Sequence, residues 1–220
     1  MARRPIPYPR CLTHHTHCGP TVQPQLHFNL AILVDDYLNN CAKCLERDKS
    51  YFESLPDLRT AIMQAGNGYF GPTKQIHSHQ ERIKKRKMPN GTKELLNLRR
   101  KNKILRCGYF EELYWIVCEV AGRKSSGLGP LWAYDVALRI WNFFGEPGPI
   151  ERVYLQSGAL NGHKNLDARL GNSIPAYVPP QRPTHWTTAK YAHVDDFPMP
   201  LRGLPSEHIE NFLCLYADHL

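Results

Sequence analysis

A tight glycine turn is the part of the sequence best suited to hold a phosphate. A Gly-Leu-Gly run at 127–129 is followed by Pro130, a residue that suits the first position of a helix. Glycine permits positive φ, and it permits the close approach of backbone to a phosphate. We therefore expect the N–H groups of Gly127 and Gly129, with the helix N-terminus that follows, to bind a nucleic-acid phosphate. Arg123 and Lys124 would add charge to this contact. The alternative is a turn between two core helices that binds no ligand.

A basic segment supplies a second candidate for phosphate binding. Residues 82–106 contain eleven lysines and arginines against one acid, Glu94; eleven minus one gives +10, whereas the whole chain carries +8. If the chain is helical from about residue 74, and a turn at Pro89-Asn-Gly91 joins the two basic runs, the cations form one patch. The candidate contacts for DNA or RNA are His79, Gln80, Arg82, Lys84, Lys85, Arg86, Lys87, Arg99 and Arg100. The alternative is a solvated basic helix.

Cysteines and histidines at close spacing suggest a zinc site. The N-terminal arm contains Cys11 and Cys18 with three histidines between them, and Cys41 and Cys44 follow in the next segment. These four cysteines could complete a tetrahedral structural site that fixes the arm to the first helix. The six-residue gap between Cys11 and Cys18 is unusual for zinc, so an arm without metal is the alternative. We expect no other cofactor.

The same residue types leave two other functions open. A nuclease or a base-excision enzyme needs a general acid or base, and the candidates for that role are His79, His163, His185 and Asp135. Catalysis also needs a cleft where titratable groups converge, whereas binding does not. The third class is a helical interaction module whose basic run meets an acidic protein. The sequence identifies no catalytic residue, so we expect binding.

The hairpin carries a resemblance to known proteins. The run Gly-Leu-Gly-Pro-x-x-Ala, within residues 120–144, is similar to the hairpin of helix-hairpin-helix DNA-binding proteins, which include the DNA glycosylases. This resemblance implies a phosphate-binding turn. Glycosylases that act as lyases carry a lysine where this chain has Leu131, and no aspartate lies between Asp135 and Asp167 to match their catalytic aspartate. Glycosylase chemistry is therefore not implied. Together with segment 207–214, the hairpin also resembles a bacterial protein family that supplies no activity to carry over.

Helices must position most of these residues. The segment from Pro130 to Phe144 is apolar nearly all round, which predicts a buried central helix, and the apolar segment 109–121 predicts its partner in the hairpin. Asp135 and Arg139 are four residues apart, so they could pair on the polar stripe of that helix. The remaining patterns predict helices over 26–48, 55–65 and 166–170 and from Ser206, a strand over 152–156 and a polar loop over 161–165.

These elements predict a mainly α protein. We expect a single helical domain over 26–220, built around the buried hairpin, and an extended, Pro-rich arm over 1–25. At most a short β element is expected near 151–157. Residues 171–205 contain seven prolines and little periodicity, so we expect a long ordered loop there.

Composition restricts the class of protein further. A hydrophobic content of 42% over 220 residues is sufficient for a sizeable core. A formal charge of +8 favours an anionic partner. No apolar run approaches the roughly 18 residues that span a membrane, so we expect no membrane partner and a cytosolic location. Seven cysteines, an odd number scattered through helical and apolar contexts, do not resemble a secreted disulfide framework, so we expect most of them to be reduced and buried.

Overall fold

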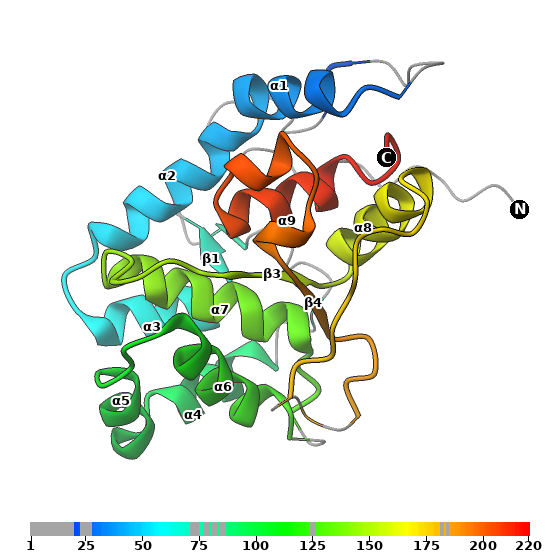
Figure 1. Cartoon of the computed structure of the whole chain (residues 1–220). Helices are drawn as coiled ribbons and strands as arrows, with labels where there is room; N and C mark the ends of the chain where they lie inside the picture. Colours follow the sequence, from blue (N-terminus) through cyan, green and yellow to red (C-terminus); the bar gives the residue numbers. More distant parts are fainter. Residues whose placement is uncertain are drawn as a thin grey trace, which may run out of the picture.

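The protein is mainly helical, as the sequence predicted (Figure 1). The structure is a computed structural model that describes residues 20–22, 28–70, 75–76, 80, 83, 87–123, 126–180, 183 and 185–220. Within these residues the α helices are α1 (Leu30–Asn40), α2 (Ala42–Glu53), α3 (Leu58–Gly66), α4 (Met88–Leu95), α5 (Leu98–Ile104), α6 (Phe110–Ala121), α7 (Pro130–Phe143), α8 (Gly158–Arg169) and α9 (Ser206–Leu215).

Short antiparallel strand pairs accompany the helices in the described part of the chain. The strands β1 (Tyr69–Phe70) and β2 (Gln75–Ile76) form one pair, and β3 (Arg152–Leu155) and β4 (Lys190–His193) form another. The strand predicted at 152–156 is thus confirmed as β3. Its partner β4 lies inside segment 171–205, where a loop was predicted, and the 3₁₀ helices η2 (Val194–Asp196) and η3 (Leu201–Gly203) follow. The prediction missed β4 because its hydrogen-bonding partner is distant in sequence.

The central helix is α7, which starts at Pro130 as predicted. Figure 1 shows α7 in the middle of the molecule, and α2, α3 and α6 pack against it. Every residue from Trp132 to Asn142 is buried, because the helix is apolar nearly all round and other elements cover each face, including its polar stripe. The indole N–H of Trp132 donates to the carbonyl of Gly66 at 3.0 Å, so α7 is tied to the end of α3.

The polar stripe of α7 finds its partners on other elements. Arg139 Nε lies 3.0 Å from Asp48 Oδ2 on α2, and its guanidinium lies over the ring of Phe52 at 5.7 Å from the centroid. Asp135 accepts a hydrogen bond from the Gln80 amide. The predicted pairing of Asp135 with Arg139 is therefore wrong, because Arg139 turns toward α2 instead.

Strand β3 contributes side chains to two hydrophobic clusters of the described residues. Tyr154 packs with the cluster around α6 and α7, whereas Val153 and Leu155 pack with the cluster around α1, α8 and α9. Successive side chains of a strand point to opposite faces, so one strand can serve both clusters. Figure 1 shows β3 running between α7 and the α8–α9 layer. The strand thus joins the two halves of the core.

Several predicted boundaries are wrong. The helix predicted over 26–48 is divided at Cys41 into α1 and α2. Residues 161–165, predicted as a loop, lie inside α8. The Cβ that a larger residue would place at Gly162 would come within 2.7 Å of the Leu213 carbonyl carbon. Glycine here lets α8 approach the backbone of α9, so a residue that reads as a loop former serves helix packing instead.

Candidate nucleic-acid interface

The predicted hairpin consists of α6 and α7, which pack together and are joined by residues 122–129. Ser126 ties this turn to both helices: its hydroxyl donates to the carbonyl of Ala121 at 2.5 Å and accepts from the N–H of Leu128 at 3.2 Å. Leu128 is buried beneath the turn. Ser126 therefore links the end of α6 to the residues that precede α7.

The two glycines of the turn differ in conformation. Gly127 has φ of +59°, in the left-handed region that favours glycine, as the sequence predicted. Gly129 has φ of −116° and ψ of 179° and is the N-cap of α7. No described atom would contact a Cβ there. Positive φ thus explains why position 127 is glycine, but it does not explain position 129. There the sequence-based expectation, the close approach of a phosphate to the backbone, stays a prediction.

A lysine from outside the hairpin lies on the turn. A Cβ added to Gly127 would overlap the end of the Lys87 side chain, with Lys87 Cε 2.7 Å away. Lys87 immediately precedes α4. Pro89, Asn90 and Gly91, predicted to form a turn, lie in the first turn of α4, so that prediction is wrong. A Cβ on Gly91 would lie 2.5 Å from Leu128 Cδ1, so glycine allows α4 to pack against the hairpin.

Two arginines meet one carboxylate at the other end of α4. Glu94 Oε2 lies 2.7 Å from Arg100 Nη1 and 3.1 Å from Arg123 Nη1. Half of the Arg123 side chain is exposed, whereas the Arg100 side chain is 17% exposed. One carboxylate cannot neutralise two guanidiniums, so the cluster keeps a net positive charge. Lys87 and Glu94 are seven residues apart along α4, so their backbone positions are separated by about 10 Å along the helix axis.

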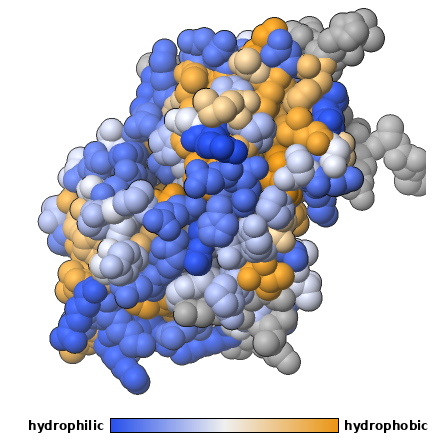
Figure 2. All heavy atoms as spheres, viewed as in Figure 1, coloured by the Kyte–Doolittle hydropathy of each residue, from blue (hydrophilic) through white to orange (hydrophobic). Residues whose placement is uncertain are grey.

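We call this region the hairpin surface, defined by Lys87, Arg100, Arg123, Gly127 and Gly129. Figure 2 shows hydrophilic residues gathered at the lower end of the molecule, over α5 in the orientation of Figure 1. Arg99 is exposed on α5. The structure thus brings together three predicted cations and the predicted turn, although these residues are distant in sequence.

The other residues predicted to contact nucleic acid lie away from the hairpin surface or outside the described residues. Gln80 is fully buried and bound to Asp135, so its predicted place on an exposed basic face is wrong. It was misassigned because its sequence neighbours are charged, while its actual partner is 55 residues away. The remaining predicted contacts lie outside the described residues: His79, Arg82, Lys84, Lys85, Arg86 and Lys124.

The residues proposed for catalysis occupy separate elements. Asp135 is buried on α7, and His163 lies on α8. His185 is exposed in the segment before β4, with its ring 6.2 Å from that of Trp186. The described candidates therefore do not form a constellation of the kind that catalysis by these residues would need.

A carboxylate–imidazole–hydroxyl chain was not predicted. His208 Nε2 lies 2.7 Å from Glu46 Oε1, and His208 Nδ1 lies 2.9 Å from the hydroxyl of Tyr37. This geometry resembles that of an activated nucleophile. However, Tyr37 is fully buried, and burial raises the pKa of its hydroxyl. These hydrogen bonds therefore link α1, α2 and α9 rather than presenting a nucleophile to a substrate. Glu46, Tyr37 and His208 were not predicted as a group because no local sequence pattern connects α9 with α1 and α2.

The predicted zinc ligands are described only in part. Cys41 is buried, with its sulfur 3.8 Å from the hydroxyl of Tyr216, and Cys44 is disulfide-bonded. A sulfur in a disulfide is not a thiolate ligand, so the zinc prediction requires this bond to be reduced. Cys11 and Cys18 lie outside the described residues. Within the described part of the chain, no group of three or more His, Cys, Asp or Glu is arranged to hold a metal.

Comparisons with protein-family models, with curated proteins and with solved structures found no match to this chain. In the part of the chain that the structure describes, no helix is long and apolar enough to cross a membrane.

Proposed function

We propose that the protein binds DNA or RNA through phosphate contacts at the hairpin surface. The observation that carries this proposal is the position of Lys87, whose ammonium lies against the Gly127 turn immediately before α7. A cation beside a helix N-terminus is suited to a phosphate, because the charge and the helix dipole attract it together. Backbone N–H groups at such a terminus can also donate to its oxygens.

The start of α7 supplies such groups. The first hydrogen bond of this helix to its cap runs from the N–H of Ala133 to the carbonyl of Gly129, at 3.2 Å. The N–H groups of Leu131 and Trp132 precede it. No described atom lies within 4 Å of the position that a Cβ would take at Gly129, which leaves room among the described residues for a phosphate to approach the backbone. These features support a site that recognises the backbone of a nucleic acid rather than its bases.

The arginine end of the surface supports a second contact. Lys87 and Arg123 lie at opposite ends of α4, about 10 Å apart along its axis, a span greater than the roughly 3.4 Å axial spacing of successive phosphates on one strand. Lys87 and Arg123 could therefore contact two phosphates of the same strand. Glu94 positions Arg100 and Arg123, and a phosphate would replace part of its interaction with Arg123. Contacts of this kind give affinity with little sequence selectivity.

The test is binding of fluorescent, mixed-sequence oligonucleotides, followed by anisotropy at low salt. We expect Lys87→Gln and Arg123→Gln to weaken binding of every sequence, since each removes a phosphate contact. Lys43→Gln is the matched control, because Lys43 is an exposed lysine on α2, outside the hairpin surface. Polyglutamate added as a competitor would identify a general polyanion site for acidic proteins. Equal affinity of the parent and both hairpin variants would overturn the proposal.

A further inference from the structure

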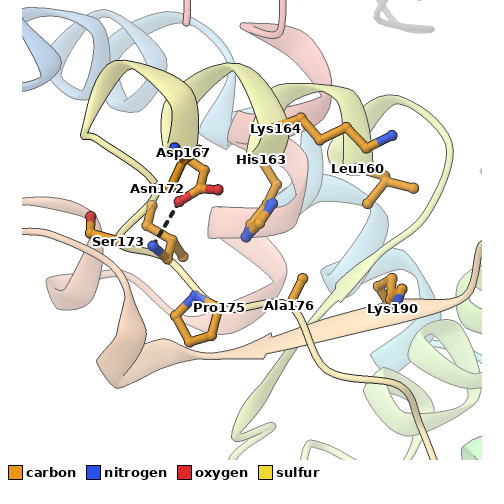
Figure 3. A pocket seen from close by; sticks show the side chains of 10 residues that line it. Leu160, His163, Lys164, Asp167, Asn172, Ser173, Pro175, Ala176 and Lys190 are labelled. Atoms are coloured by element: carbon orange, nitrogen blue, oxygen red, sulfur yellow. Dashed lines mark hydrogen bonds between the residues drawn. The ribbon is translucent and has the colours of Figure 1, made fainter.

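A cavity and an exposed helix face lie outside the hairpin surface in the described part of the chain. The cavity, of about 670 Å³, lies between α8, segment 172–176 and the start of β4, and His163 is part of its lining (Figure 3). Both ring nitrogens of His163 are buried, so a ligand in the cavity cannot contact them. The exposed face, on α5, instead offers side chains that a ligand can reach.

Three large apolar side chains are exposed on α5 and at the start of α6. Leu98 is 72% exposed, Leu105 is 55% exposed, and Tyr109, the N-cap of α6, is 70% exposed. The two leucines are seven residues apart, and the N–H of Leu105 still donates to the carbonyl of Lys101 at 3.0 Å, as in a helix. Both leucines therefore project from the same side of α5. Exposed apolar side chains that gather in this way mark a contact surface more often than single ones do.

A line of cations runs beside the leucines. Arg99, Lys103 and Arg106 are exposed, and they follow one another at helical spacing, i, i+4 and i+7. Among the described residues, Arg99 and Arg106 have no ion pair. Lys103 lies 3.9 Å from Glu119, and both side chains are about half exposed, so this pair is weak. The Glu112 carboxylate accepts a backbone N–H at 2.8 Å. Three cations against two carboxylates leave this side of α5 positively charged.

The same helix adjoins the hairpin surface. Arg100, which is held by Glu94 in that surface, is the next residue after Arg99 on α5. Helix α5 packs against α6, and Figure 1 shows the two helices together at the lower end of the molecule. Helix α6 has 12 residues and is thus about 18 Å long, and it leads from Tyr109 toward Arg123. A bound strand could therefore contact both regions.

We propose that this side of α5 binds a single-stranded nucleic acid. We call it the α5 face, defined by Leu98, Arg99, Lys103, Leu105, Arg106 and Tyr109. The phosphates lie along the line of cations, and unpaired bases stack on the Tyr109 ring and cover the leucines.

The exposed apolar groups are the reason for choosing a single strand. Phosphate binding accounts for the cations of the α5 face but leaves Leu98, Leu105 and Tyr109 without a role. The bases of a duplex are stacked on one another, so their faces are not open to such side chains, whereas those of a single strand are. This inference rests on the proposed function: the hairpin surface supplies phosphate contacts, and the α5 face adds contacts to bases.

The experiment compares a labelled, mixed-sequence DNA single strand with the duplex of the same sequence, by anisotropy with the full chain. We expect the parent to bind the single strand about tenfold more tightly, because stacking on Tyr109 is open only to unpaired bases. Tyr109→Ala should weaken single-strand binding about tenfold and leave duplex binding unchanged. Tyr109→Phe keeps the ring and should bind as the parent does. Tyr177→Ala is the matched control, because Tyr177 is an exposed tyrosine beside β4.

A second variant and a competitor complete the test. Leu98→Gln combined with Leu105→Gln should also weaken single-strand binding alone, and it tests the α5 face without changing the cap of α6. Equal affinity of the parent for both forms, or parental single-strand affinity in both α5 variants, would overturn the proposal. Displacement of the single strand by polyglutamate as readily as by unlabelled single strand would also overturn it, in favour of an acidic protein. Because Lys87→Gln should weaken both forms, duplex binding without a single-strand preference refutes the α5 face alone. Absence of binding to either form refutes the proposed function as well.

Discussion

Alanine substitution at the two hairpin glycines should have different consequences. At Gly127 an alanine must adopt φ near +59°, which costs about 1 kcal/mol for a residue with a Cβ. The new methyl group must also displace the end of Lys87, a cheap movement because that side chain is flexible. We therefore expect Gly127→Ala to lower the free energy of unfolding by about 1 kcal/mol or slightly more.

At Gly129 two opposite effects of alanine on the free energy of unfolding nearly cancel. The backbone is extended and no described atom would contact a Cβ, so alanine gains about 0.4–1 kcal/mol by restricting the unfolded chain. Alanine is a poorer N-cap than glycine, and this loss is of similar size. In a protein of this length, 1 kcal/mol corresponds to about 2–4 °C in Tm. Gly127→Ala should thus melt about 2–4 °C below the parent, and Gly129→Ala near it.

Two assays on the same samples separate stability from binding. Calorimetry gives the melting temperatures, and anisotropy gives the oligonucleotide affinities below both transitions. If a phosphate approaches the backbone at Gly129, the added methyl group should weaken binding without lowering Tm. A Gly127→Ala protein that melts with the parent would refute the conformational argument. A Gly129→Ala protein with parental affinity would remove that residue from the phosphate site.

Three further predictions concern buried groups. Asp48→Ala leaves the Arg139 guanidinium, 3% exposed, without its carboxylate, and should cost about 3–5 kcal/mol in urea unfolding; a loss below about 1 kcal/mol would contradict the buried pair. Trp132→Phe removes the donor to the Gly66 carbonyl and should lower the free energy of unfolding by about 1–3 kcal/mol in the same measurement. An unchanged free energy of unfolding is expected only if a water molecule replaces the indole N–H. Because burial lowers the pKa of His163, the unfolded chain binds a proton there before the folded chain does, so stability is retained above about pH 6.5 and falls below it. His163→Gln should reduce this fall between about pH 7.5 and 5.5, and identical slopes in parent and variant would contradict the lowered pKa.

The elements that the sequence predicted well are those with a strong local pattern. The helix from Pro130 is apolar nearly all round, and β3 is short and β-prone, so their identities follow from the residues themselves. The hairpin turn was also recognisable, because Gly127 adopts a conformation that few other residues tolerate. Elements of this kind are determined by their own local sequence.

The elements that were missed depend on partners distant in sequence. Gly91 and Gly162 read as turn and loop residues, yet each lies in a helix where a missing side chain lets another element approach. Glu94 holds Arg123 across 29 positions, and this pairing, which shapes the hairpin surface, has no signature in the local pattern. The cavity around His163 is likewise assembled from segments that the sequence did not place together.

The salt dependence of oligonucleotide affinity tests the central claim most directly. Each neutralised phosphate of a duplex contributes about −0.9 to the slope of log affinity against log salt, so contacts from Lys87 and Arg123 predict a slope of about −1.8 or steeper. Lys87→Gln should reduce its magnitude by about 0.9. No detectable binding at about 50 mM salt, or an affinity that does not change with salt, would contradict phosphate binding at the hairpin surface.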